Sequence, residues 1–181
     1  GDFSLHPYAP SYLYETGVEK WEGFPVAGTI WYQGESDAGH PDMYDELLST
    51  LIGAWREKWN DEFPFYFVQL APFGIWLGCD SVNYEIVRDK QAKVSLTVPN
   101  TGMASIMDIG AYEDIHPKQK MEVGRRLGLL ALGKTYGKDI LCESPRMIKA
   151  DRNGNVITLE SSIPGISGTN GFAPGERMSL S

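Results

Sequence analysis

Polar and ionisable side chains follow three short apolar runs of the sequence, VAGTIWY, FYFV and TGMASIM. Amides, carboxylates and a histidine are the side chains that acid–base and nucleophilic chemistry use. The residues that follow these runs are Gln33, Gly34, Glu35, Gln69, Asp108, Glu113, Asp114 and His116. A catalytic site is therefore predicted where these three stretches meet.

His116 is the strongest single candidate, because it lies between an acidic loop and the predicted start of a helix at Pro117. An imidazole beside a carboxylate suits a general base, and a surface histidine at a helix N-terminus is the alternative interpretation. Glu35 follows an apolar strand and a glycine, which predicts partial burial. Since a buried carboxylate needs a partner or a function, Glu35 is either a structural hydrogen-bond anchor or a catalytic carboxylate.

No metal site is predicted. Asp37, His40 and Asp42 are closely spaced, but such spacing is common in turns and lacks the ordered ligand pattern of a calcium loop. Cys79 and Cys142 have neither CxxC nor metal-ligand spacing, so they are either buried thiols or one distant disulfide.

The elements that position these groups alternate along the chain. Apolar runs at residues 26–32, 64–71 and 101–108 predict buried strands. Helices are predicted over 43–59, 82–94 and 117–136, the first of them with apolar residues at every fourth position. This alternation predicts an α/β fold with a parallel sheet covered on both faces. In such a sheet, functional residues gather at the carboxyl ends of the strands.

The length of 181 residues indicates one domain, or one domain plus the start of another. The sequence carries 24 acidic and 16 basic residues with a net charge of −8, and it has no basic stripe of the kind that binds nucleic acid. No apolar run approaches the roughly 20 residues of a membrane span. We therefore expect neither nucleic acid nor a membrane as a partner.

The last part of the chain differs in character. Residues 151–155 (DRNGN) are typical of a hairpin turn. We therefore predict a first domain over residues 1–143, and a β-hairpin-containing extension over residues 144–181 that would begin a small β domain.

Several segments together resemble the sialate O-acetylesterase group of the SGNH hydrolases, over roughly residues 10–145. They are GTIWYQGESDA at 28–38, WREKW at 55–59, FPFYFVQLAPF at 63–73, MDIG at 107–110, DIHP at 114–117 and GRRL at 124–127. The resemblance implies a flavodoxin-like, three-layer α/β/α sandwich. It also implies a serine esterase that removes acetyl groups from carbohydrates such as sialic acid and needs no cofactor.

The resemblance assigns roles to individual positions. His116 matches the catalytic histidine, which takes the proton of a serine hydroxyl. Gln33 and Gly34 match a segment that helps to form the oxyanion hole. Glu35 matches the glutamate proposed to complete the triad. Many SGNH hydrolases place an aspartate three residues before the histidine, but this chain has Glu113 there and Asp114 one residue later. The ranking for the orienting carboxylate is therefore Glu35 first, Asp114 second and Glu113 third.

The nucleophile is unassigned. The family's serine lies in an N-terminal segment resembling GQSNM, which residues 1–181 do not contain. Ser4 lies in GDFSL, which differs from the GDSL signature by an inserted Phe, and Ser36 of QGES does not match the nucleophile position. We therefore expect the chain to be the second half of an esterase domain, with a companion N-terminal segment or chain that carries the serine.

Two functions of different class are open. The first is hydrolysis of O-acetyl esters on sugars, with acetylated carbohydrate as the substrate. The alternative is a non-catalytic carbohydrate-binding module that lacks the nucleophile. The substrate class of the first function predicts a periplasmic or secreted protein.

Overall fold

The computed structural model describes residues 9–162 of the chain, so Ser4 and the end of the C-terminal extension lie outside the described residues. The strands are β1 (Thr29–Trp31), β2 (Phe65–Gln69), β3 (Ile75–Trp76), β4 (Cys79–Asp80), β5 (Thr101–Ser105), β6 (Arg146–Asn153) and β7 (Val156–Ser162). The α-helices are α1 (Tyr44–Trp59), α2 (Tyr84–Thr97) and α3 (Lys120–Leu130). Single-turn helices occupy Tyr14–Val18, Glu19–Trp21, Glu35–Gly39, Pro41–Met43 and Ala131–Thr135.

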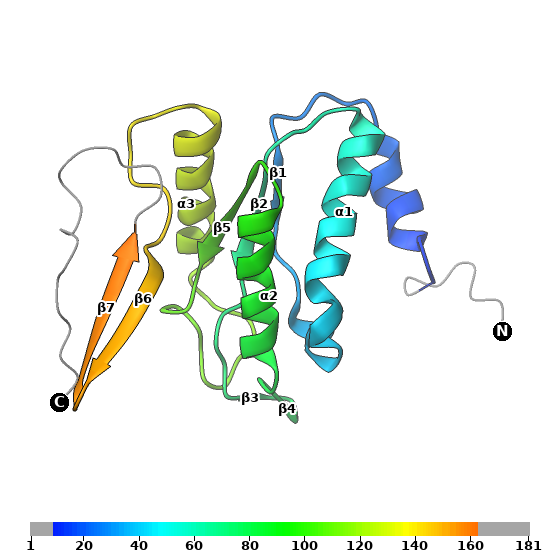
Figure 1. Cartoon of the computed structure of the whole chain (residues 1–181). Coiled ribbons are helices and arrows are strands. Elements are labelled where there is room, and N and C mark those ends of the chain that lie inside the picture. The colour runs from blue at the N-terminus through cyan, green and yellow to red at the C-terminus, as the bar shows by residue number, and fades with distance from the viewer. Residues whose placement is uncertain (1–8, 163–181) are drawn as a thin grey trace.

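A parallel sheet with the strand order β1-β2-β5 forms the centre of the molecule. Thr29 pairs with Phe65, and Phe65 pairs with Thr101, so the three strands start level with one another. Helices α1 and α2 pack on one face of this sheet and α3 packs on the other (Figure 1). The predicted α/β fold with a parallel sheet is confirmed.

The middle strand explains why the run FYFVQ carries no polar alternation. Phe65 and Phe67 point toward α1 and α2, whereas Tyr66 and Val68 point toward α3. All four side chains are buried, because a strand covered on both faces must be apolar on both sides. The two apolar clusters on either side of β2 make up the core.

The buried guanidinium of Arg56 binds backbone carbonyls at the amino end of this sheet. Arg56 of α1 is only 5% exposed. Its Nε donates to the Phe63 carbonyl at 3.1 Å, and its two amino groups donate to the carbonyls of Pro99 and Asn100, both at 3.0 Å. These carbonyls lie just before β2 and β5. One side chain therefore fixes the entry of the chain into two strands, a role that helical periodicity alone does not reveal.

Some predicted boundaries are wrong. Helix α3 begins at Lys120 and not at Pro117, because Gln119 has a non-helical ψ of 54° and Lys120 N–H bonds back to the Lys118 carbonyl. The third strand ends at Ser105, since the chain then turns with a bond from Ile109 N–H to the Ile106 carbonyl.

Strands β6 and β7 form an antiparallel hairpin around Gly154, whose φ is +62°. The DRNGN turn is thus found where the sequence predicts it. That residues 144–181 begin a separate β domain stays a prediction. Within residues 9–162, none of the helices combines the length and apolar character of a membrane span.

Candidate functional site

The turns that follow β1, β2 and β5 lie together at the carboxyl end of the sheet, the end that carries β3 and β4 in Figure 1. A direct contact joins two of these turns to each other, because Gly74 N–H donates to the Tyr112 carbonyl at 2.9 Å. The third turn contacts the start of α3, since the Lys120 ammonium lies 4.5 Å from the centre of the Tyr32 ring. The topology therefore gathers the three polar stretches of the sequence at one end of the sheet.

His116 and Asp114 form a pair in the turn before α3. Asp114 Oδ1 accepts the His116 backbone N–H at 2.9 Å and lies 3.2 Å from His116 Nδ1. These two donors, the backbone N–H first, hold the pKa of the Asp114 carboxyl below its usual value, so Asp114 stays ionised at neutral pH. Because Asp114 faces Nδ1, the other ring nitrogen is left for proton transfer. The His116 side chain is 65% exposed and so accessible to a reactant.

Trp76 of β3 packs edge-on against the His116 ring, with the ring centres 5.1 Å apart and an angle of 85° between the planes. The segment that carries Trp76 is fixed to the histidine turn, because Ile75 N–H also donates to the Tyr112 carbonyl. A Cβ on Gly74 would lie 2.3 Å from the Tyr112 ring, so a larger residue at this position would displace that exposed ring. Trp76 was not among the residues predicted from the sequence, where its only signal is an aromatic side chain in the segment after β2.

The Gln33–Gly34 turn is held by two side chains. The Tyr44 hydroxyl donates to the Gln33 carbonyl at 2.8 Å, and Gln33 Nε2 donates to Asp37 Oδ2 at 2.5 Å. Gly34 has a φ of +142°, and a Cβ there would lie 3.0 Å from the Tyr44 hydroxyl. Both the backbone conformation and the lack of space require glycine at this position.

Glu35 is half-buried at the start of the turn Glu35–Gly39. Burial, and after it the negative charge of Glu35, raises the pKa of Tyr32 to about 12. The same two causes, in the same order, raise the pKa of Tyr84. The Glu35 carboxylate therefore lies near the side chains of Tyr32 and Tyr84. In the part of the chain that the structure describes, no hydrogen bond or ion pair joins Glu35 to His116.

The other candidates make no contact with the histidine. Glu113 is exposed and has no ion pair among residues 9–162, and Ser36 is exposed in the turn after β1. Over the same residues, no group of three or more histidine, cysteine, aspartate and glutamate side chains could hold a metal ion. Of the three carboxylates considered for His116, the structure brings Asp114 to it.

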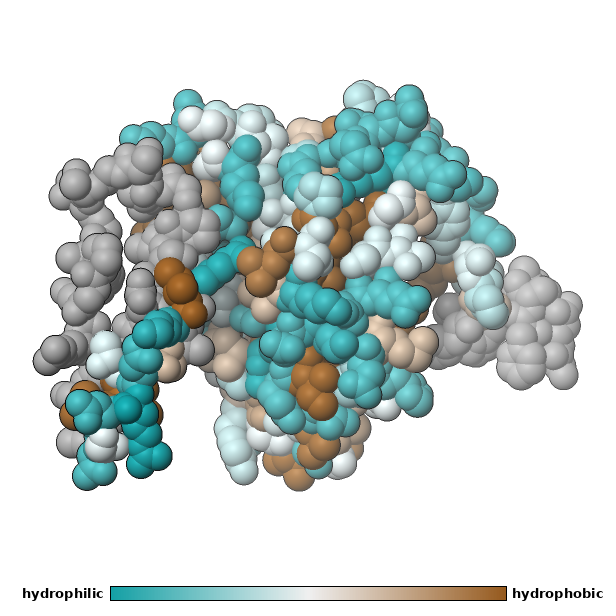
Figure 2. All heavy atoms as spheres, in the orientation of Figure 1, coloured by the Kyte–Doolittle hydropathy of each residue, from teal (hydrophilic) through white to brown (hydrophobic). Residues whose placement is uncertain are grey.

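The surface beside this end of the sheet is partly apolar. Figure 2 shows hydrophobic residues at the lower edge of the molecule, over β3 and β4. Ile75, Leu77 and Val82 are the exposed apolar residues of this segment, and Tyr112 is exposed as well. The neighbourhood of Trp76 and His116 therefore offers apolar contact area.

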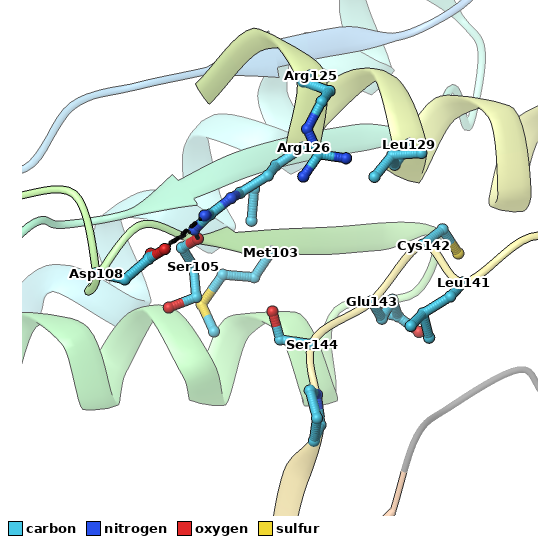
Figure 3. A pocket seen from close by; sticks show the side chains of 12 residues that line it. Met103, Ser105, Asp108, Arg125, Arg126, Leu129, Leu141, Cys142, Glu143 and Ser144 are labelled. Atoms are coloured by element: carbon cyan, nitrogen blue, oxygen red, sulfur yellow. Dashed lines mark hydrogen bonds and ion pairs between the residues drawn. The ribbon is translucent and has the colours of Figure 1, made fainter. Parts of the chain in front are cut away.

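A cavity of about 530 Å³ lies elsewhere, between β5, α3 and residues 141–145 (Figure 3). Arg126 crosses it and binds the Asp108 carboxylate at 2.6 and 2.7 Å. This ion pair lowers the pKa of Asp108 to about 2. The cavity lining includes neither His116 nor Gln33, so the cavity and the candidate catalytic residues are different places on the molecule.

A smaller cavity of about 80 Å³ lies beside the Gln33 turn. Its lining residues are Trp31, Gln33, Asp37, Tyr44, Leu47, Leu48 and Leu51. It therefore lies between the end of β1, the turn that follows it and α1.

Comparisons with known proteins agree with this arrangement. The chain is 29% identical over 157 residues to the sialate O-acetylesterases of Rattus norvegicus and Homo sapiens, a match that covers 77% of this chain. It also matches the crystal structure of a carbohydrate acetylesterase from Xanthomonas citri, with a TM-score of 0.70, 37% identity and 80% of this chain covered. The chain spans 29% to 30% of the length of the two curated relatives and 34% of the solved chain. Residues 4–133 match the family model described as carbohydrate esterase, sialic acid-specific acetylesterase. The chain therefore belongs to the carbohydrate esterase family of sialic acid-specific acetylesterases.

Proposed function

We propose that the polypeptide carrying this chain hydrolyses O-acetyl esters on carbohydrates, with O-acetylated sialic acid as the first substrate to test. The observation that carries the proposal is the Asp114–His116 pair at the carboxyl end of the sheet, in a chain of this esterase family. Sialate O-acetylesterases and a carbohydrate acetylesterase among the similar proteins support the same reaction. A periplasmic or secreted location follows from this substrate class and is part of the proposal.

In the proposed mechanism, His116 takes the proton of a serine hydroxyl while the serine oxygen attacks the acetyl carbonyl carbon. The tetrahedral intermediate collapses to an acetyl-serine, and the imidazolium gives its proton to the departing sugar oxygen. His116 then removes a proton from water, which attacks the acetyl-serine. Acetate leaves, and the serine regains its proton from the imidazolium. In both halves the charge of Asp114 stabilises the imidazolium and holds its ring in place.

The serine that reacts is proposed to come from a segment outside residues 1–181 that adds a strand beside β1. Two features support this. Ile30, in the middle of β1, is 68% exposed, although its position in a strand run suits burial. The indole N–H of Trp31 is buried without a hydrogen-bond partner among the described residues, and buried donors are normally paired. A neighbouring strand would flank the Ile30 side chain on its open side, and it could supply an acceptor for the indole N–H of Trp31.

The test is acetate release from O-acetylated sialic acid and from acetylated xylo-oligosaccharide by the complete native polypeptide. Replacing His116 with Ala should lower kcat/KM by about 100-fold or more, because the general base is lost. His40→Ala is the matched control, since His40 is an exposed histidine in the turn before α1. Full activity of the His116 variant would contradict the assignment. Binding of acetylated glycan without any turnover by the unmodified polypeptide would favour the non-catalytic carbohydrate-binding alternative.

A further inference from the structure

A fully buried amide connects the core to the Gln33–Gly34 turn. Gln91 of α2 is 0% exposed. Its Oε1 accepts the Leu70 backbone N–H at 2.9 Å, and its Nε2 donates to the Val68 carbonyl at 3.1 Å and to the Tyr44 hydroxyl at 3.3 Å. Every polar atom of the Gln91 amide is thus used. Burying an amide is favourable only when its bonds are complete, so this position depends on all three partners.

The unequal lengths of β1 and β2 explain why an amide lies here. Thr29 N–H donates to the Pro64 carbonyl, and backbone groups alternate sides along a strand, so the even-numbered residues of this segment face β1. Strand β1 ends at Trp31, which pairs with Phe67. The Val68 carbonyl and the Leu70 N–H therefore lie beyond the end of β1. Gln91 supplies the donor and acceptor that the missing strand residues would have provided.

The Tyr44 hydroxyl connects the Gln91 amide to the Gln33–Gly34 turn. It accepts from Gln91 and donates to the Gln33 carbonyl at 2.8 Å. None of the described peptide bonds is cis, and in a trans peptide the C=O and N–H point in opposite directions. Fixing the Gln33 carbonyl against Tyr44 therefore turns the Gly34 N–H away from the core.

The Gly34 N–H is the group that the hydrogen bonds of Gln91 and Tyr44 orient. Gly34 is buried, yet its N–H has no acceptor among residues 9–162. Buried backbone donors without an acceptor are rare. Donors held in place before the reaction, and aimed at the charge that develops in it, are what stabilises an oxyanion. The hydrogen bonds of Tyr44 and Gln91 therefore hold an unpaired backbone donor in a fixed direction.

We propose that Tyr44 and Gln91 are positioning residues for the oxyanion hole, and that they act by fixing the Gln33–Gly34 peptide so that its N–H meets the tetrahedral oxyanion. This inference rests on the proposed esterase function. Neither side chain needs to touch the substrate, because both act through the backbone of the turn.

The test compares Tyr44→Phe with Tyr66→Phe in the complete native polypeptide. Both tyrosines are 3% exposed, and each hydroxyl makes a short hydrogen bond, that of Tyr66 to Thr135 Oγ1 at 2.8 Å. Tyr66 lies on the α3 face of the sheet, so it controls for the loss of a buried hydroxyl. Tyr44→Phe should lower kcat by about 10-fold to 100-fold with KM changed by less than about 3-fold. Tyr66→Phe should leave kcat unchanged, and neither variant should alter the pH profile, because the Asp114–His116 pair is untouched.

A second variant tests whether Tyr44 and Gln91 act together on the Gln33–Gly34 peptide. Gln91→Met keeps the volume and removes all three hydrogen bonds, so kcat should fall here too. The double variant Tyr44→Phe/Gln91→Met should lose no more kcat than the larger single change, because residues that act as a unit are not additive. Wild-type kcat in Tyr44→Phe, or an equal fall in Tyr66→Phe, would overturn the positioning role. Absence of esterase activity in the unmodified polypeptide would overturn the proposed function itself and this inference with it.

Discussion

At the scale of single residues, the orientation of His116 depends on short-range contacts. Asp114 is only two residues away and binds both the backbone N–H and Nδ1, so the turn itself carries the carboxylate. An exposed pair of this kind contributes little to stability. The pair instead fixes the orientation of the His116 ring. Trp76, from the segment after β2, also packs edge-on against this ring. The ionised state of Asp114 matches this role, since the negative charge must be present when the imidazolium forms.

Asp114→Asn should lower kcat by about 100-fold or more, because an amide cannot balance the imidazolium charge. Since the pKa of Asp114 is held below its usual value, the carboxylate is ionised at pH 7, where acetate release measures the loss. Glu113→Gln is the control, because Glu113 is exposed and should not affect kcat. Glu35→Gln should cost less than Asp114→Asn. The reverse order would identify Glu35 as the orienting carboxylate.

At the scale of elements, an ionic contact joins the two helices on one face of the sheet. Asp45 of α1 lies 2.5 Å from the Lys93 ammonium and 3.2 Å from that of Lys90, both on α2. These contacts, the bond from Lys93 first, lower the pKa of the Asp45 carboxyl to about 2 from the ordinary value of 3.8. Tyr44, the residue before Asp45 in α1, makes the hydrogen bonds to Gln91 and Gln33 described above. The helix pair therefore positions the turn as well as covering the sheet.

Asp45→Asn should lower the free energy of unfolding at pH 7. A carboxyl whose pKa is lower in the folded state contributes fully above its unfolded pKa and loses that contribution as pH falls toward its folded pKa. The difference from wild type should therefore shrink between about pH 4 and about pH 2. Urea unfolding at stepped pH measures it, with Asp61→Asn in the exposed turn after α1 as the control. A difference that stays constant over this range would rule out the linkage.

The sequence predicts the elements better than it predicts their contacts. The apolar run at residues 65–69 identifies a strand buried on both faces, because that property is local. The roles of Arg56 and Gln91 escape prediction, since both lie within helical patterns and their partners are backbone groups far along the chain. The sequence ranks Asp114 below Glu35 as the partner of His116, because sequence spacing does not show how a turn directs its side chains.

At the scale of the whole molecule, the outer edge of β1 has no neighbouring strand among residues 9–162. An unpaired strand edge is an aggregation hazard unless something covers it. The nearby groove of about 320 Å³ has an apolar lining that includes Trp21, Val26, Trp55 and Trp59. Together with exposed Ile30, this groove extends the apolar surface along the side on which the proposed strand would add.

Ile30→Ala separates a covered edge from an open one in the complete native polypeptide. If a strand covers Ile30 there, truncation should cost about 2–4 kcal/mol of unfolding free energy, as for other buried isoleucines. If the residue is as exposed as in residues 9–162, the change should stay within about 0.5 kcal/mol. Met121→Ala on the outer side of α3 is the control, because Met121 is exposed there. We expect the large cost for Ile30, measured by denaturant unfolding, and a small one would contradict the added strand.

The guanidinium of Arg56 aligns the strands from a place that is separate from the candidate site. It binds three carbonyls just before β2 and β5, at the end of the sheet opposite to the candidate catalytic turns. A lysine could not replace it, because a single ammonium lacks the planar set of donors. Substitutions in the loops beyond Gln69 and Ser105 can therefore change the candidate site without removing the contacts that keep the strands aligned.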